Sequence, residues 1–256
     1  MSYSRMQLRN TSKEIISAFI WQHILLAHSL FIMALGVALC VQSALGSSVI
    51  STVPYVMSLA GETGRVPDLT IGEYTWAMNA LLVVAQILIL RKHFKAVQLF
   101  QLVVGVFFGY FIDVNMSLIS VFPNCELLHG FLLQLFGCCV LACGISFEIR
   151  CGSVTMPGEG ITVAVSQVSG IPFPKAKIIV DISLVIIALS LGFLFFGTWL
   201  WNVVGPGTLF AMFFVGAVVK LIDPHMGWFA KLLTVKPGMK RYVYGLAKFI
   251  YRHKLD

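Results

Sequence analysis

Apolar residues dominate the chain in eight long runs, and the short stretches between them hold most of the charged residues. A helix needs about 20 predominantly apolar residues to cross the hydrocarbon core of a bilayer. The alternation of apolar and polar positions that is typical of a membrane β-barrel is absent from the sequence. Because backbone groups in lipid must form hydrogen bonds within their own segment, the runs are expected to be helices. They cover residues 22–43, 46–61, 74–90, 97–115, 127–147, 154–169, 176–200 and 206–223. The pattern predicts an all-α integral membrane protein, folded as a helical bundle.

Two of the eight runs are poor membrane spans. Segment 46–61 is short, rich in hydroxyl residues and interrupted by Pro54. Segment 154–169 carries the sequence Pro-Gly-Glu-Gly at 157–160 in its first half. We expect both segments to be re-entrant or broken half-helices, which enter and leave the membrane on the same side. Six full spans then remain.

The charged loops favour six spans over eight. Cytoplasmic loops of membrane proteins carry an excess of lysine and arginine. With a cytoplasmic N-terminus, eight spans would place Arg91, Lys92 and Lys95 outside and the loop with Glu126 inside, against this bias. Six spans and two half-helices reverse both placements and also put the basic C-terminal tail inside. The expected protein is a multi-pass protein of the bacterial inner membrane with both termini in the cytoplasm.

The two halves of the chain resemble each other when they are shifted by 108 residues. The shift aligns residues 36–60 with 144–168 without a gap, so that Gly36 meets Gly144 and Ser51 meets Glu159. Each half then contains a span, a broken segment and two further spans. Three crossings per half reverse the second half relative to the first, which predicts two inverted repeats. This plan is typical of secondary transporters, whose substrate site lies between the halves.

The predicted organisation has five parts. They are a cytoplasmic N-terminal segment (1–21), a first membrane repeat (22–115), an extracytoplasmic connector (116–126), a second membrane repeat (127–224) and a basic amphipathic cytoplasmic tail (225–256).

The composition agrees with a membrane protein and places the excess positive charge in the tail. Hydrophobic residues make up 58% of the chain and charged residues 11%, with a net charge of +7. From Lys231 to Asp256 there are seven basic residues against one acidic residue, interleaved with aromatic side chains. Such a segment is expected to lie on anionic lipid, and we expect no nucleic-acid partner. The oligomeric state is left open.

Ionisable side chains inside a membrane are the first candidates for function. Glu159 lies between Gly158 and Gly160, where an open backbone and free N–H groups could attract an anion while the carboxylate takes a proton or a cation. The alternative is that Glu159 only caps its half-helix. Asp181 is the second candidate, and it could instead pair with Lys177 one helical turn away.

Neutral polar residues complete the predicted site. Asn79 is the repeat mate of Asp181, and Ser51 and Thr52 begin the first half-helix. The predicted substrate-binding residues are therefore Ser51, Thr52, Asn79, Gly158, Glu159, Gly160 and Asp181. No nucleophile–base pair, phosphate-binding loop or metal motif is present, so neither an enzyme nor a cofactor or metal site is expected.

Several stretches resemble a known family. The run GVALCVQSALGSSVISTVPYVMSL, the stretch around ILILRKHF, and MPGEGITVAVSQVSGIPFPKAKIIVDISLVIIAL are similar to the YczE-like bacterial membrane proteins, which are loosely grouped with the YitT family. The resemblance covers roughly residues 25–225, and the family often has proline where Val49 stands. It implies a bacterial inner-membrane protein presumed to be a transporter, with no settled substrate and no catalytic residues.

The leading hypothesis is a secondary transporter or permease for a small polar or anionic solute. The solute would bind between the two broken segments, with Glu159 or Asp181 coupling to H⁺. The competing hypothesis is a membrane regulator or accessory subunit that acts as a scaffold through its basic tail. An intramembrane enzyme is a third, weaker hypothesis.

Overall fold

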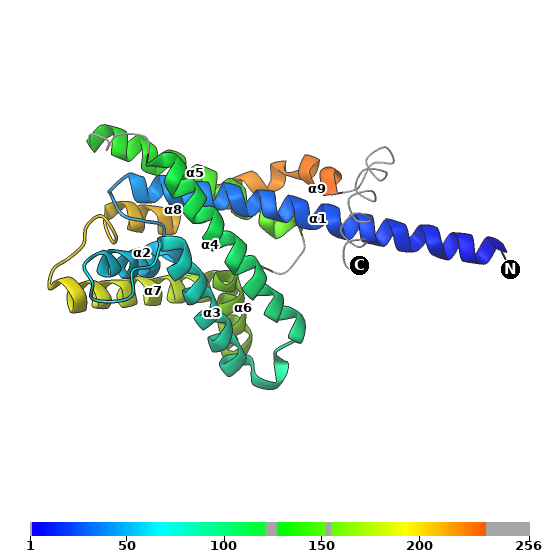
Figure 1. Ribbon diagram of the computed structural model, residues 1–256, viewed down its shortest axis with the longest axis horizontal. Helices are drawn as coiled ribbons and strands as arrows, with labels where there is room; N and C mark the ends of the chain where they lie inside the picture. Colours follow the sequence, from blue (N-terminus) through cyan, green and yellow to red (C-terminus); the bar gives the residue numbers. More distant parts are fainter. Residues whose placement is uncertain (1, 121–126, 152–154, 234–256) are drawn as a thin grey trace.

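The computed structural model describes residues 2–120, 127–151 and 155–233, and it is helical almost throughout these ranges (Figure 1). The helices are α1 (Ser2–Gln42), α2 (Val49–Glu62), α3 (Ile71–Leu90), α4 (Phe100–Ile119), α5 (Leu127–Cys151), α6 (Pro157–Ser169), α7 (Phe173–Phe196), α8 (Pro206–Ile222) and α9 (Gly227–Leu233), with three short 3₁₀ turns at Arg91–His93, Ala96–Leu99 and Asp223–His225. These ranges contain no β-strand. The predicted all-α fold is confirmed.

Six of the helical segments are long and apolar enough to cross a membrane. They are Ile16–Gln42, Ile71–His93, Ala96–Ile119, Leu128–Cys151, Phe173–Phe196 and Pro206–His225. In contrast, α2 has 14 residues and α6 has 13. At 1.5 Å per residue each is only about 20 Å long, shorter than the ~30 Å hydrocarbon core. The prediction of six spans and two half-helices is therefore confirmed.

Local sequence signals explain where these helices begin and end. Thr70 and Glu73 form a reciprocal capping box at the start of α3, and α6 begins with Pro157 in its first turn. Gly197 takes a left-handed conformation with φ of 68° and ends α7. The predicted run 176–200 is therefore shifted, because the helix starts earlier and the residues after Gly197 form a connection.

A pair of glycine contacts relates the two repeats. In Figure 1, α1 and α5 lie side by side and run in opposite directions, as inverted repeats require. A Cβ added at Gly36 would lie 2.5 Å from the Leu141 backbone nitrogen, and one added at Gly144 would lie 2.6 Å from the Met33 nitrogen. The shift of 108 residues converts each of these contacts into the other. The predicted inverted repeat therefore extends to individual contacts at the centre of the bundle.

The other helix contacts follow the same exchange. The contact of α1 with α4 corresponds to that of α5 with α8. In the same way, the contact of α2 with α7 corresponds to that of α6 with α3, and the contact of α2 with α3 corresponds to that of α6 with α7. The exception is the last pair of spans: α3 packs along α4, whereas α7 and α8 make no comparable contact. In the second repeat the connection at 197–205 folds back instead, and its Val203 carbonyl accepts a hydrogen bond from the Ser47 N–H at 2.9 Å.

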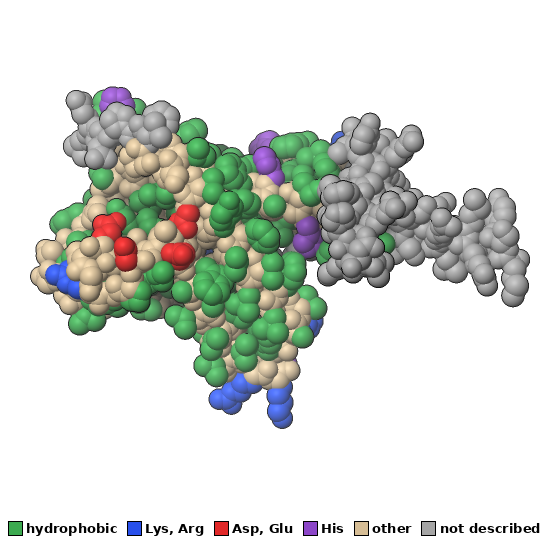
Figure 2. Space-filling model, viewed as in Figure 1, with side chains coloured by type: hydrophobic (Ala, Val, Ile, Leu, Met, Phe, Trp, Pro, Cys, Tyr) green, Lys and Arg blue, Asp and Glu red, His purple; other side chains and the backbone are tan. Residues whose placement is uncertain are grey.

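Opposite charges mark the two ends of the bundle. Arg91, Lys92 and Lys95 are exposed at the connection between α3 and α4, which we call the basic end. Glu62 and Asp68 are exposed at the connection between α2 and α3, which we call the acidic end. Figure 2 shows the acidic side chains gathered on the left, and basic side chains at the bottom and at the left edge. The loop with Glu126 and the tail from residue 234 onward lie outside the described residues.

Cysteine labelling tests this arrangement. We expect Glu62→Cys and Arg91→Cys, each in a background without the natural cysteines, to react with an impermeant maleimide from opposite sides of the membrane. The reason is that the 20 residues of α3 separate the two positions by about 30 Å. The readout is labelling of intact cells compared with inverted vesicles. Labelling of both positions from the same side would contradict the six-span topology.

Candidate functional site

Buried polar side chains from three helices gather around the first turn of α6. Glu148 on α5 is 3% exposed, and its Oε1 accepts a hydrogen bond from the Met156 N–H at 2.8 Å. Its second oxygen, Oε2, is buried and has no hydrogen-bond partner among the described residues. Pro157 follows and carries no N–H. A carboxyl group from the neighbouring helix therefore caps α6 by accepting a hydrogen bond at its start.

Two glutamine side chains from the first repeat reach the same turn. Gln86 on α3 donates from Nε2 to the Pro157 carbonyl at 3.2 Å and to Gln101 Oε1 on α4 at 3.0 Å. Gln86 Oε1 is buried without a partner. A Cβ added at Gly160 would lie 2.6 Å from Gln86 Oε1 and 2.7 Å from Gln101 Oε1. Gly160 is therefore needed for the two amides to reach the half-helix.

An ion pair on α7 completes the cluster. Lys177 Nζ lies 2.7 Å from Asp181 Oδ1, one helical turn away, so the predicted pairing of these residues is present. Lys177 also interacts electrostatically with Glu159, which in turn interacts with Glu148. Lys177 is thus the only basic group that interacts with Glu159 and Asp181 among the described residues, and Glu148 lies next to Glu159 in this network. A cluster with this excess of acidic groups in a low-dielectric environment can bind a proton or a small cation.

The other predicted site residues lie near this cluster or satisfy themselves locally. The two half-helices meet at their first turns, where a Cβ added at Gly158 would lie 2.7 Å from Ile50 Cδ1 on α2. The Ser51 hydroxyl donates to the Ser48 carbonyl at 2.9 Å, and that of Thr52 donates to the Val49 carbonyl at 2.8 Å. Both hydroxyls are therefore used within α2.

Asn79 is fully buried on α3 and packs against Gly105 of α4. Neither its Oδ1 nor its Nδ2 has a hydrogen-bond partner among the described residues. It lies two helical turns before Gln86 on the same face of α3, about 10 Å along the axis. A polar stripe with unused hydrogen-bonding groups therefore runs from the middle of α3 to the tip of α6.

The predicted site residues did not include Gln86, Gln101 and Glu148. Spacing offered a signal for two of them. Gln86 follows Asn79 by seven residues, and Glu148 follows the core residue Leu141 by seven. A step of seven returns to nearly the same helix face. Glu148 therefore lies on the face of α5 that packs into the bundle, although it is close to the end of the helix.

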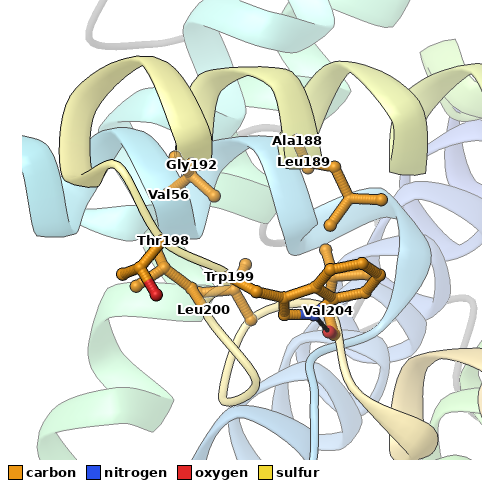
Figure 3. A pocket seen from close by; sticks show the side chains of 9 residues that line it. Val56, Ala188, Leu189, Gly192, Thr198, Trp199, Leu200 and Val204 are labelled. Carbon is orange, nitrogen blue, oxygen red and sulfur yellow. Dashed lines mark hydrogen bonds between the residues drawn. The ribbon is translucent and has the colours of Figure 1, made fainter.

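The corresponding place in the other half lacks this chemistry. The alignment that pairs Asn79 with Asp181 also pairs Gln86 on α3 with Ala188 on α7. At Ala188, α2 packs on α7 through apolar side chains. Figure 3 shows the small cavity at this contact, about 10 Å³, between α2, α7 and the connection that carries Trp199. The Trp199 Nε1 donates to the Val204 carbonyl at 2.7 Å across the turn. The candidate site is therefore confined to α6, although the scaffold is repeated.

A family described as a family of unknown function (DUF6198) matches residues 20–224, which include both predicted repeats. The chain belongs to this family. No curated protein and no solved structure matches the chain. The resemblance to the YczE-like and YitT groups therefore stays a prediction.

Proposed function

We propose that this multi-pass membrane protein is a proton-coupled secondary transporter rather than an enzyme. The observation that carries the proposal is the first turn of α6, where ionisable side chains of the second repeat meet amides of the first. Buried carboxyl groups between inverted repeats are typical of sites that bind a solute and a coupling ion. Movement of one repeat against the other would expose this turn to each side in alternation.

The charges of the cluster favour a neutral polar or cationic solute over an anionic one. An anion at the tip of α6 would compete with Glu148 for the Met156 N–H. It would also approach Glu159 and Asp181, which are opposed by Lys177 alone within the cluster. The unused amide of Asn79 and the unused carbonyl oxygen of Gln86 suit a solute that both donates and accepts hydrogen bonds.

The orientation follows from the loop charges. We propose that the basic end faces the cytoplasm of a bacterial inner membrane, because lysine and arginine concentrate on that side. The tail would then reach anionic lipid on the same face. The part of it that the structure describes, α9, packs on the bundle, since Trp21 Nε1 donates to the Leu232 carbonyl at 2.7 Å.

Proteoliposomes with a pH-sensitive dye inside test the transporter proposal. A panel of small polar and cationic solutes, each applied as a gradient, should contain members that drive proton movement. Glu159→Gln should abolish this movement because it removes a titratable group from the cluster, whereas Glu73→Gln on the outer turn of α3 should not. Unchanged coupling in Glu159→Gln would contradict the role of Glu159.

The scaffold hypothesis predicts a different pattern. Deletion of residues 231–256 would then cause the whole cellular phenotype, and Glu159→Gln would cause none. A comparison of metabolites between a deletion strain and strains carrying each variant separates the two functions. A change of the same solute pools in the full deletion and in Glu159→Gln would support transport.

A further inference from the structure

A second polar feature lies at the acidic end, apart from the α6 cluster. A cavity of about 320 Å³ opens there between the end of α2, the connection that follows it, the start of α3 and the end of α4. In Figure 2 it lies on the face where the acidic side chains gather. Its lining shares no residue with the α6 cluster and consists of Ser58, Glu62, Asp68, Leu69, Thr70, Ile71, Asp113, Met116 and Ser117.

The cavity wall carries three carboxyl groups and no basic side chain. Asp113 is fixed in place, because its Oδ2 accepts from the Thr70 hydroxyl at 2.7 Å and its Oδ1 from the Gly72 N–H at 2.9 Å. Glu62 and Asp68 accept no hydrogen bond from the described residues and are exposed. The nearest arginine in sequence, Arg65, stacks over the Phe196 ring at 4.9 Å. The negative charge of the cavity is thus left for a ligand to neutralise.

Ser58 gives independent support for a ligand. Its side chain is 8% exposed, it lines the cavity, and its hydroxyl makes no hydrogen bond to the described residues. A serine within a helix usually donates to the carbonyl one turn earlier, as Ser183 and Ser190 do on α7. The Ser58 hydroxyl is therefore available to a molecule in the cavity.

The size and the walls of the cavity indicate what kind of cation fits. No three histidine, cysteine or acidic side chains of the described residues lie close enough to hold a metal ion. The volume is in the range of small-molecule sites, which begin at about 300 Å³. Leu69, Ile71 and Met116 supply an apolar wall beside the carboxyl groups. A cation with a short aliphatic body uses both surfaces.

We propose that this cavity binds a small organic ammonium ion. The ammonium group would lie among Glu62, Asp68 and the Ser58 hydroxyl, and the aliphatic part would lie against Leu69 and Met116. Asp113 would add its charge without moving, since its oxygens are already bonded. Binding at this place requires no transport, so the proposal stands independently of the function assigned to the α6 cluster.

Binding of n-butylammonium to the full chain in nanodiscs of zwitterionic lipid tests this site. The measurement is saturation-transfer NMR titration, with empty nanodiscs as the reference and with butan-1-ol and butyrate as neutral and anionic probes. We expect n-butylammonium alone to bind. The double variant Glu62→Gln/Asp68→Asn should bind about tenfold more weakly, as expected for the loss of two partly exposed charge pairs. Ser58→Ala should weaken binding by about threefold, the cost of one hydrogen bond.

Glu73→Gln is the matched control, because it removes a carboxylate from the same end of the bundle at a position that does not line the cavity. It keeps an acceptor for the Thr70 N–H, so the capping box survives. Equal weakening by Glu73→Gln and by the double variant would reduce the effect to general surface charge and overturn the proposal. Binding of butan-1-ol as tight as that of n-butylammonium, or no binding of either, would also overturn it.

Discussion

Replacing Gly144 with leucine is expected to drive α5 away from α1 and to destabilise the whole bundle. A single Cβ at this position would already lie 2.5 Å from Met33 Cγ and 2.6 Å from the Met33 backbone nitrogen. The backbone cannot move aside without separating the helices, and close approach at small residues is a main source of helix association in lipid. The loss should be at least about 3 kcal/mol, the upper range for overpacking, and should lower the melting temperature by about 10 °C.

The repeat supplies a second variant for the same prediction. Gly36→Leu should have a similar effect, because its contact with Leu141 is the exchanged copy of that between Gly144 and Met33. Gly216→Ala is the control, since a Cβ there meets no atom within 4 Å. The measurement is thermal unfolding of the purified protein in detergent, followed by size-exclusion chromatography. A melting temperature of Gly144→Leu equal to that of Gly216→Ala would contradict this packing.

The sequence was sufficient to predict the repeat because its signals are local or depend on order along the chain. The shift of 108 residues paired Gly36 with Gly144 before any contact was known, and both glycines lie in the α1–α5 interface. The half-helices begin at Val49 and Pro157, which the same shift aligns. The charges of the loops then favoured six spans over eight, because the excess of lysine and arginine in a loop indicates the side of the membrane on which that loop lies.

The inward faces of the helices could not be predicted in the same way. A helix in lipid is apolar on all sides, so apolar periodicity does not mark the side that packs against its neighbours. Gln86 and Glu148 therefore appeared as isolated polar residues. The placement of α6 against α3 and the hydrogen bond from Met156 to Glu148 bring them together. The separation of α7 from α8 was equally hidden, because it depends on the connection at 197–205 folding onto α2.

The two polar features occupy different positions relative to the half-helices. The α6 cluster lies where the first turns of α2 and α6 meet, whereas the acid-lined cavity lies at the opposite end of α2 and includes its last residue, Glu62. Thr70 at the start of α3 lies at the cavity, and Gln86 near the other end of the helix lies at the tip of α6, so α3 spans the distance between the two features.

Replacing Glu148 is expected to separate proton coupling from the stability of the fold. Glu148→Gln keeps a carbonyl oxygen that accepts the Met156 N–H, so α6 stays capped, and it removes one titratable group. Its melting temperature should stay close to that of the unchanged protein, since the hydrogen bond from the Met156 N–H is kept. Glu148→Leu should cost about 1–3 kcal/mol, because the Met156 N–H is left buried without a partner.

Glu148→Gln should change transport, although it should leave the stability of the fold nearly unchanged. With one proton bound per cycle, the rate in proteoliposomes is expected to change by about tenfold per pH unit across the titration of the cluster. Glu148→Gln should lose this dependence while remaining folded. Glu73→Gln, measured in parallel, should keep both the rate and its pH profile. A folded Glu148→Gln protein with an unchanged profile would remove Glu148 from the coupling mechanism and leave it as the cap of α6.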